Sequence, residues 1–218
     1  MKLPIIKKLR KKVYQDIAIF QDTIIDVLYS SNTSIVMHGG TVIWRCFSGN
    51  RFSNDIDAYI TTKVNIKGIK KHLESTALDY GINVEKVKDT GNLLFIGFSL
   101  ADIYVKVELN HAARIPQPVT MRFERADGTF TDILCLSVND LILEKIRAYS
   151  NRKFIRDIYD IYIISSYLEK NSKIMKEMSA FLTNVPIPID EGKLSALIYY
   201  GAVPSFNDMI AYIKRKTL

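Results

Sequence analysis

The chain has 218 residues, enough for one large domain or two small ones. Hydrophobic residues make up 48% of it, which allows a proper core and excludes a disordered chain. Its 30 basic and 23 acidic residues give a net charge of +7, which suits a polyanionic partner but also occurs in many ordinary enzymes.

Two cysteines, Cys46 and Cys135, are too few for a disulfide scaffold, and we expect both to be reduced thiols in the core. The N-terminus lacks the long apolar stretch and the small-residue cleavage site of a secretory signal. No apolar run reaches about 18 residues, the length of a membrane-spanning helix. We therefore expect a cytoplasmic protein that does not act at a membrane.

The first 136 residues alternate between helical and strand-like patterns. Apolar residues three to four apart predict a long helix over 5–29, and a short strand over 34–37 then leads through a glycine pair into a helix over 41–47. Turn signals at Asp89–Asn92 and Ala126–Gly128 predict two hairpins. The other predicted elements are a helix over 66–80 and strands over 55–61, 83–88, 92–99, 102–110, 118–125 and 130–135.

After Ser137 the pattern is helical throughout. Ser137 is a predicted N-cap, with the acidic Asp140 three residues later. We therefore expect an α/β (α+β) domain over 1–136, followed by a helical domain over 137–218. Helices are predicted over 138–150, 153–168, 171–183, 190–200 and 205–216.

The most informative pattern is a glycine pair followed by an acidic pair. Gly39 and Gly40 open a helix, where backbone N–H groups can approach a phosphate closely. Asp55 and Asp57 lie two residues apart in a strand, so their carboxylates point to one face and can hold a hard cation such as Mg²⁺. Together these motifs indicate a site for a metal–nucleotide complex. The simpler alternative is a glycine turn beside a solvated acidic pair.

A second polar face runs along the strand predicted over 102–110. Apolar residues alternate there with Lys106, Glu108 and Asn110, which therefore share a face. If this strand lies beside the Asp55–Asp57 strand, Glu108 becomes a third carboxylate. Three acids around one or two Mg²⁺ ions would orient a triphosphate and activate an attacking hydroxyl. The alternative is a half-exposed strand whose polar face is in water.

Two helices of the second half contain further candidate residues. Lys145 offers a point charge for nucleotide phosphates if a carboxylate steadies it. Asp157 and Asp160 lie three residues apart and share a helix face, and Arg156 is spaced to pair with Asp160. The alternatives are a solvent-facing lysine and a surface ion pair. His38, next to the glycine pair, is expected to be buried in a supporting role.

The motif Gly39-Gly40-Thr41, followed by Arg51-Phe52-Ser53-Asn54-Asp55-Ile56-Asp57, resembles the opening motif of the AbiEii/AbiGii-type nucleotidyltransferase toxins. That family belongs to the DNA polymerase β-like nucleotidyltransferase superfamily. The segments 143–148 and 156–162 resemble its two later motifs in the same order, so the resemblance covers roughly residues 30–165. It implies a nucleotidyltransferase core with a mixed sheet and a C-terminal helical region.

The resemblance also implies a reaction and its partners. A nucleoside monophosphate would pass from an NTP to an acceptor hydroxyl with Mg²⁺, or alternatively Mn²⁺, and pyrophosphate would leave. Some family members are toxins that extend tRNA acceptor ends and are countered by a cognate antitoxin, so RNA and an antitoxin are implied partners. The alternatives are a small-molecule or protein acceptor, or a non-catalytic relative that binds nucleotide, RNA or a partner protein.

The resemblance finally implies roles for single residues. Asp55, Asp57 and Glu108 would bind metal, and Glu108 would replace the usual aspartate. Lys106, on the same face, is the alternative functional group of that strand. The implied catalytic residues are Asp55, Asp57, Glu108, Lys145, Asp157 and Asp160. The implied nucleotide-binding residues are Gly39, Gly40, Thr41, Arg51, Ser53, Lys106 and Lys145.

Overall fold

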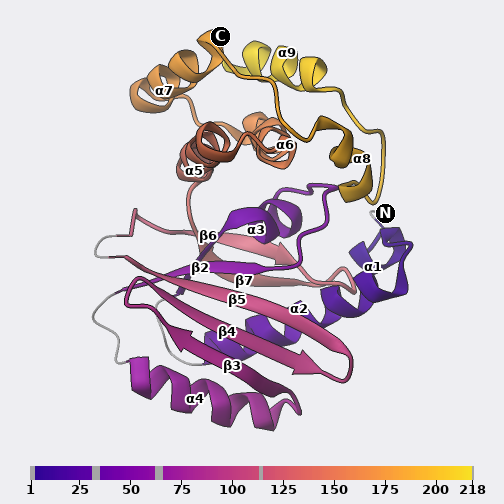
Figure 1. Ribbon diagram of the computed structural model, residues 1–218, viewed down its shortest axis with the longest axis vertical. Helices are drawn as coiled ribbons and strands as arrows, with labels where there is room; N and C mark the ends of the chain where they lie inside the picture. The colour runs from indigo at the N-terminus through magenta and orange to yellow at the C-terminus, as the bar shows by residue number, and fades with distance from the viewer. Residues whose placement is uncertain (1–2, 31–34, 62–65, 113–114, 218) are drawn as a thin grey trace.

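The computed structural model describes residues 3–30, 35–61, 66–112 and 115–217. The described residues form a seven-stranded mixed sheet in the order β3-β4-β5-β2-β1-β7-β6 (Figure 1). The α/β (α+β) fold predicted from the sequence is therefore confirmed. The strands are β1 (Ile35–His38), β2 (Ile56–Thr61), β3 (Asn83–Asp89), β4 (Leu93–Leu100), β5 (Ile103–Ala112), β6 (Val119–Glu124) and β7 (Phe130–Cys135).

Both predicted hairpins are present. Strands β3 and β4 pair antiparallel across the first turn, and β6 and β7 across the second. Strand β5 continues the meander by pairing antiparallel with β4. Its other edge pairs with β2 in parallel, and this pairing joins two strands that are distant in the sequence. Ser34, at which the sequence predicts that β1 begins, lies outside the described residues.

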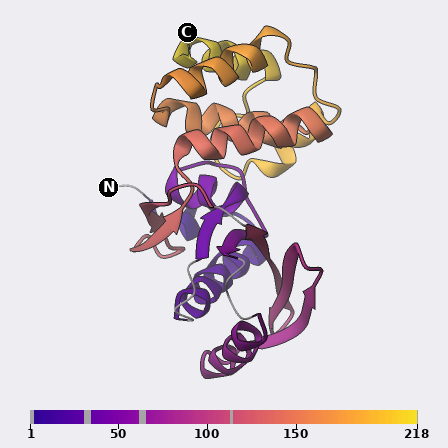
Figure 2. The same cartoon turned by 90° about the vertical axis from the view of Figure 1, so that its left-hand side faces the viewer.

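The two faces of β2 differ because its residues alternate. Ile56, Ala58 and Ile60 are fully buried, on the face that the helices α2 and α4 cover. Asp57 and Tyr59 point to the opposite face and are half-buried. This polar face looks toward the C-terminal helices, which stack above the sheet in both views (Figures 1 and 2).

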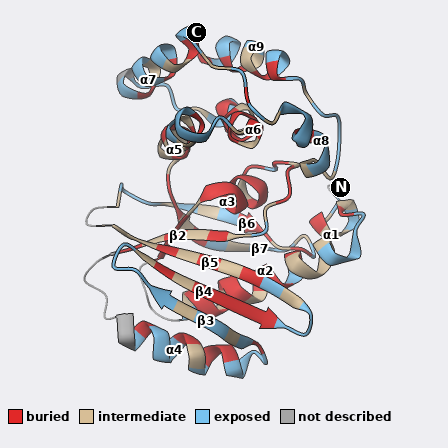
Figure 3. Ribbon diagram, viewed as in Figure 1, coloured by how far each residue is buried: buried red, intermediate tan, exposed pale blue. Residues whose placement is uncertain are grey.

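The helices of the first half are α1 (Ile5–Lys8), α2 (Lys12–Ser30), α3 (Gly39–Cys46) and α4 (Ile66–Asp79). The single helix predicted over 5–29 is wrong, because the chain breaks at Leu9, whose backbone is extended. Burial explains the break: the Leu9 side chain enters a small apolar cluster with Trp44 and Phe52. Helix α3 is buried along most of its length, between the sheet and the C-terminal helices (Figure 3).

The helices of the second half are α5 (Val138–Arg152), α6 (Ile155–Ile164), α7 (Ser172–Thr183), α8 (Leu194–Leu197) and α9 (Phe206–Thr217). Ser137 caps α5 as predicted, since its Oγ accepts a hydrogen bond from the Asp140 backbone N–H. The helix predicted over 153–168 ends early and continues as a 3₁₀ turn over Ser165–Tyr167.

The helix predicted over 190–200 is wrong. It is a 3₁₀ turn over Glu191–Lys193 followed by the single turn of α8. The chain leaves the helical conformation at Ile198, whose backbone forms a β-bridge with Arg51. This bridge ties the C-terminal segment to the loop that precedes β2.

Buried apolar residues from both halves of the chain form one large cluster. It includes Ile56 and Val107 of the sheet together with Ile158 and Met209 of the C-terminal helices. The proposed boundary between residues 136 and 137 stays a prediction. Both cysteines are free thiols; Cys135 is buried and Cys46 half-buried. No helix in the described parts of the chain is long and apolar enough to span a bilayer.

Candidate active site

Two glycines begin α3 because neighbouring side chains leave no room for a Cβ atom. Gly39 has a φ of +78°, and a Cβ there would lie 2.3 Å from the Oδ2 atom of Asp57. A Cβ on Gly40 would lie 2.4 Å from Nη2 of Arg51 and 2.8 Å from Oγ of Ser53. The glycine pair thus lets an acid, a guanidinium and a hydroxyl approach the start of a helix.

Thr41 is buried within the site and faces away from open space. Its hydroxyl donates a hydrogen bond to the backbone carbonyl of Asp55, with 2.5 Å between the oxygens. This contact fixes the first turn of α3 against the entry to β2. Thr41 therefore positions the acidic pair, and its hydroxyl is already engaged.

The acidic residues converge because β2 and β5 are parallel neighbours. Asp57 lies directly opposite Glu108 in the register, and both side chains are on the polar face. The sequence predicts Glu108 as a third carboxylate only if these two strands are neighbours. The pairing of β2 with β5 meets that condition. The loop leading to Asp55 is held by Gln21, whose Nε2 donates to the carbonyls of Ser53 and Asn54.

Lys106 lies between two of these carboxylates. Its Nζ is 3.2 Å from Oδ2 of Asp55 and 2.9 Å from Oε1 of Glu108. Partial burial acts to lower the pKa of the Lys106 ammonium, but its bonds to Glu108 and Asp55 outweigh burial and raise it. Lys106 is thus a firmly protonated counter-ion of the acidic group.

Asp57 is the most buried of the three acids. Burial raises the pKa of its carboxyl above the ordinary value, and the charges of Glu108 and Asp55 raise it further. His38 and Lys145 act in the opposite direction. The site therefore holds negative charge that would be stabilised by an added cation.

His38 has the supporting position that the sequence predicts. Its Nδ1 lies 3.2 Å from Oε2 of Glu144, and its ring stacks on Tyr59 with centroids 4.2 Å apart. The Tyr59 hydroxyl donates to Oε1 of Glu144. Burial alone would raise the pKa of Glu144, but hydrogen bonding and charge from His38, with help from Tyr59, lower it. This network links β1 and β2 to α5 beside Asp57.

The second group of candidates forms a buried charge network between α5, α6 and the loop before β2. Asp160 accepts two hydrogen bonds of 2.9 Å from Arg51 and lies 2.7 Å from Nζ of Lys145. Asp157 accepts two of 2.7 Å from Arg152. Burial raises the pKa of Asp160, but Arg51 and Lys145 outweigh it, so the net pKa is lowered.

The surface interpretation of these residues is wrong, because Asp157 and Asp160 are 0% and 1% exposed. The suggested pairing of Arg156 with Asp160 is also wrong, since Arg51 and Lys145 occupy the Asp160 carboxylate. Lys145 is likewise buried rather than solvent-facing. The two aspartates hold cations in place and do not reach open space themselves.

A polar cavity of about 290 Å³ unites the two groups. The predicted site residues that line it are Gly40, Arg51, Ser53, Asp55, Asp57, Lys106, Glu108 and Lys145. Thr41, Asp157 and Asp160 are not among its walls. Gly39 contributes to an adjoining cavity that shares Asp57, Glu108 and Lys145 with this one.

Two arginines that line the cavity, Arg152 and Arg156, were not predicted as site residues. Arg152 lies seven residues after Lys145 on α5, two helical turns along the same face, and this spacing was a usable signal. Arg156 carried no comparable signal, because its placement depends on how α6 packs. Both add positive charge opposite the carboxylates.

The cavity can therefore bind a polyanion and a cation together. Carboxylate oxygens of Asp55, Asp57 and Glu108 are the ligands that Mg²⁺ prefers. No group of three or more His, Cys, Asp or Glu side chains in the described residues encloses a metal position by itself. Lys145, Arg152 and Arg156 face the same space, where they would meet phosphate oxygens. This combination suits a nucleotide that completes the metal's ligands.

Solved structures from two organisms share this fold. The structure resembles JHP933 from Helicobacter pylori, with a TM-score of 0.62 and 17% identity over 95% of this chain and 90% of that one. It also resembles MenT4, a nucleotidyltransferase toxin from Mycobacterium tuberculosis, with a TM-score of 0.59 and 16% identity over 92% and 81%. At these identities the likeness establishes the fold alone.

The sequence itself matches one family model. The model describes the nucleotidyl transferase AbiEii toxin of type IV toxin–antitoxin systems, and it matches residues 26–191. No curated protein matches the chain. The matched segment contains every residue of the polar cavity.

Proposed function

The chain belongs to the AbiEii nucleotidyl transferase toxin family, and on that premise we propose that it transfers a nucleoside monophosphate from an NTP to a hydroxyl of RNA. The acceptor in this proposal is the 3′ end of a tRNA. The protein would act as the toxin of a toxin–antitoxin pair, with a cognate antitoxin as its counterpart.

One observation carries the proposal: paired carboxylates and several cations face each other across a single polar cavity. Asp55 and Asp57 lie on one wall, and Lys145 lies on another with Arg152. Phosphoryl transfer needs little covalent chemistry from the protein, since positioning and charge neutralisation supply most of the catalysis. The cavity offers both.

The residues fit a divalent cation that a nucleotide helps to hold. Mg²⁺ is usually bound by one or two carboxylates together with substrate phosphates and waters, so a closed protein cage is not needed. Asp55 and Asp57 would be its protein ligands, and Glu108 is proposed to assist. The Lys106 ammonium already bridges Asp55 and Glu108, which supports a cationic position between them. When bound, the metal would supply charge neutralisation and activation of the acceptor hydroxyl.

In this mechanism the acceptor oxygen bonds to the α-phosphorus as the bond from that phosphorus to the β-phosphate oxygen breaks. Backbone N–H groups at Gly39 and Gly40, with the Ser53 hydroxyl, would bind the phosphates. Lys145 would neutralise charge on the leaving pyrophosphate, and Asp157 and Asp160 would keep the cations aimed at the cavity. Glu108 would accept the proton of the attacking hydroxyl.

The RNA acceptor is supported by the charge of the whole chain. A net charge of +7 favours a polyanion over a small neutral acceptor. The family description, a toxin of a type IV system, supports the toxin role and the existence of an antitoxin. Neither observation selects the nucleotide.

The test is incubation of the purified protein with Mg²⁺, total RNA and each α-³²P-labelled NTP in turn. An Asp55→Ala/Asp57→Ala double variant serves as the control. Label in a tRNA-sized band, absent from the control and from a reaction with EDTA, is the expected result, and it names the nucleotide.

Other outcomes have distinct meanings. Label in protein or in a small molecule overturns the RNA acceptor but keeps the transfer chemistry. If calorimetry shows binding of Mg–NTP but no transfer is seen, the acceptor is not one of the RNAs supplied. If neither label nor binding is seen, the protein is a non-catalytic relative.

A further inference from the structure

The sheet face that holds the acids continues beyond them. Because side chains alternate, Tyr59 follows Asp57 on β2, and Asn110 and Ala112 follow Glu108 on β5, all on the same face. The strands are parallel neighbours here, so the two rows extend side by side. From Glu108 to Ala112 the strand advances about 13 Å, at about 3.3 Å per residue. Helix α5 lies opposite this floor.

Two hollows follow this face away from the polar cavity described above, which we term the catalytic cavity because of its proposed role. The first, of about 380 Å³, shares Asp57, Glu108 and Lys145 with the catalytic cavity and extends to Tyr59 and Arg147. The second, of about 290 Å³, shares three residues with the first. These shared residues are Tyr59, Glu144 and Arg147. The three hollows therefore follow one another along α5, and the Tyr59–Glu144 hydrogen bond crosses the boundary between the last two.

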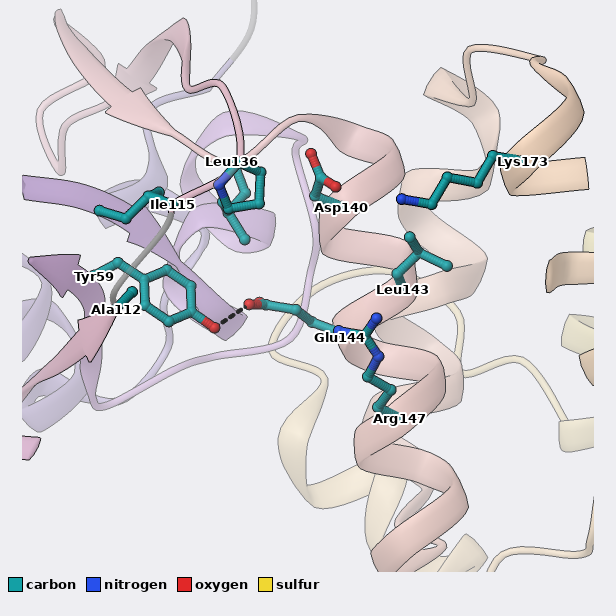
Figure 4. Close-up of a pocket in the computed structure, with 10 residues that line it drawn as sticks. Tyr59, Ala112, Ile115, Leu136, Asp140, Leu143, Glu144, Arg147 and Lys173 are labelled. Atoms are coloured by element: carbon teal, nitrogen blue, oxygen red, sulfur yellow. Dashed lines mark hydrogen bonds between the residues drawn. The ribbon is translucent and has the colours of Figure 1, made fainter. Parts of the chain in front are cut away.

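The far hollow, which we term the outer pocket, has walls unlike those of the catalytic cavity. Figure 4 shows Tyr59, Ala112, Ile115 and Leu136 on one side and the residues of α5 on the other. The remaining lining residues are Pro116, Asp140, Leu143, Glu144, Arg147 and Lys173. Apolar side chains thus share the walls of the outer pocket with charged ones, a mixture that suits an organic ligand with both apolar and polar groups.

Two cations at the outer pocket are available for a ligand. Arg147 of α5 and Lys173 of α7 are both exposed, and within the described residues neither side chain forms a hydrogen bond or an ion pair. In contrast, the carboxylates of this pocket are engaged: Asp140 accepts from Ser137, and Glu144 accepts from Tyr59. The polar groups of the outer pocket that can still bind a ligand are therefore the cationic side chains of Arg147 and Lys173, which are hydrogen-bond donors.

We propose that the outer pocket binds a nucleoside whose phosphate end reaches the catalytic cavity. The apolar walls would contact the base, and Arg147 would donate hydrogen bonds to the base or to an adjoining phosphate. A single hollow, entered past the Tyr59–Glu144 hydrogen bond, separates the outer pocket from Asp57, so a ligand that passes this bond brings one end to the proposed reacting atoms. This inference rests on the proposed function, because it assigns a place to part of that reaction's substrates.

The nucleoside has two sources, the incoming NTP and the terminal nucleotide of the acceptor. Both present a base, a ribose and a phosphate, and the outer pocket with its adjoining hollow suits either. An NTP would place its triphosphate beside Lys145. An acceptor strand would place its terminal hydroxyl there and its preceding phosphate near Arg147 and Lys173.

The experiment uses the full-length protein and three variants. Arg147→Met removes an exposed cation, and Ala112→Phe fills the apolar part of the pocket. Lys176→Met is the matched control, since Lys176 is an exposed cation on the same helix as Lys173 but outside the pocket. One arm measures binding of a non-hydrolysable NTP by calorimetry without acceptor. The other measures KM for the acceptor RNA at saturating NTP.

We expect Arg147→Met to weaken one of the two by about tenfold, the usual effect of losing a hydrogen bond to a charged group. Ala112→Phe should weaken the same arm at least as much, and Lys176→Met should match wild type. Loss of NTP affinity assigns the pocket to the donor nucleotide. An increase in acceptor KM alone assigns it to the acceptor.

Unchanged values in both arms for Arg147→Met, with an unchanged thermal unfolding midpoint, overturn the inference. Arg147 is exposed and has no ion pair among the residues that the structure describes, so this variant should fold even if Ala112→Phe does not. If wild-type protein transfers no label to any acceptor, the proposed function fails. In that case the calorimetric arm still tests the pocket by itself.

Discussion

At the scale of single residues, the acidic group contains Asp55 and Asp57, which the sequence indicates as a pair. Lys106 lies between Asp55 and the third acid, Glu108. The sequence left open whether Glu108 or Lys106 is the functional group of its strand. Lys106 Nζ lies within 3.2 Å of Asp55 and 2.9 Å of Glu108, so the two candidates are partners. In this structure the charge of one is balanced by the charge of the other.

Asp57→Asn should abolish transfer and leave the fold intact. The carboxylate is proposed as a metal ligand, and loss of such charge stabilisation typically lowers kcat by about 100-fold or more. Burial raises the pKa of Asp57, so its charged form costs stability above the folded-state pKa. The neutral asparagine removes that cost.

The unfolding midpoint of Asp57→Asn at pH 7–8 should therefore equal or exceed that of wild type. The difference should shrink as the pH falls through the folded-state pKa and vanish below the ordinary aspartate pKa, where the wild-type carboxyl is protonated in both states. Transfer assays and urea denaturation measure the two effects. Full transfer activity in this variant contradicts the metal assignment.

Lys106→Met should increase affinity for a divalent cation in the absence of nucleotide. The substitution removes the ammonium that competes for Asp55 and Glu108, leaving their charge uncompensated. Because Lys106 is 30% exposed at its side chain, losing the ion pairs should change folding stability by less than about 1 kcal/mol. Mn²⁺ titration followed by electron paramagnetic resonance gives the affinity.

The exposed Lys88 provides a matched lysine on the same sheet, outside the cavity. Lys88→Met should leave Mn²⁺ affinity at the wild-type value. Equal affinity in all three proteins shows that Lys106 does not occupy a cation position.

At the scale of secondary-structure elements, the start of α3 decides how closely the acids approach the backbone that we propose binds phosphate. Gly39 combines a left-handed backbone with direct contact to Asp57. The sequence predicted the Gly-Gly turn, but only the packing of β2 beside α3 shows why a side chain is excluded there. Thr41 completes the arrangement through its bond to the Asp55 carbonyl.

Gly39→Ala should destabilise the protein and abolish transfer. A non-glycine residue at positive φ costs about 1–3 kcal/mol, and the new Cβ would also displace the Asp57 carboxylate. Gly91→Ala is the control, because Gly91 has a φ of +83° but nothing within 4 Å of an added Cβ. Chemical denaturation and transfer assays should show that both variants lose stability and that Gly91→Ala alone keeps its activity. Retained transfer in Gly39→Ala would show that Asp57 tolerates displacement.

At the scale of the whole molecule, buried charges join the sheet half of the chain to the helical half. Arg51, from the loop before β2, pairs with Asp160 of α6, which also holds Lys145 of α5. The same loop pairs through its backbone with Leu197 and Tyr199 of the C-terminal segment. The residues that line the polar cavity are therefore spread widely along the sequence, from Gly40 to Arg156, and come from both halves of the chain.

Asp160→Asn should destabilise the protein by about 3–5 kcal/mol, because it leaves Arg51 and Lys145 buried with less compensation. The lowered pKa of Asp160 means that the wild-type carboxylate stabilises the fold above its unfolded-state pKa. That contribution is lost as the pH falls through the folded-state value.

The stability difference between wild type and Asp160→Asn should thus be constant near neutral pH and decrease below about pH 4. Urea denaturation at a series of pH values from 7 to 3 measures it. A difference that does not change with pH shows that the destabilisation comes from geometry rather than from charge.

The sequence by itself determined the mixed α/β fold, the order of its strands along the chain and the short motifs at Gly39-Gly40 and Asp55–Asp57. These features depend on local periodicity and turn chemistry, which neighbouring residues specify. The sequence also suggested Glu108, conditionally, because alternation along one strand fixes a face but not a neighbouring strand. Its errors, at Leu9 and over 190–200, fall where contacts with distant segments end a helix.

Only the tertiary structure decided which charges meet. The parallel pairing of β2 with β5 placed Glu108 opposite Asp57. The packing of α5 against α6 buried Asp157 and Asp160, which the sequence left open as surface residues, and there they hold cationic side chains in place. The row of hollows from the polar cavity to the outer pocket likewise needs a strand floor and a helix that are distant in sequence. The physical reason is that a side chain's partners and burial are set by long-range packing, about which local sequence periodicity contains no information.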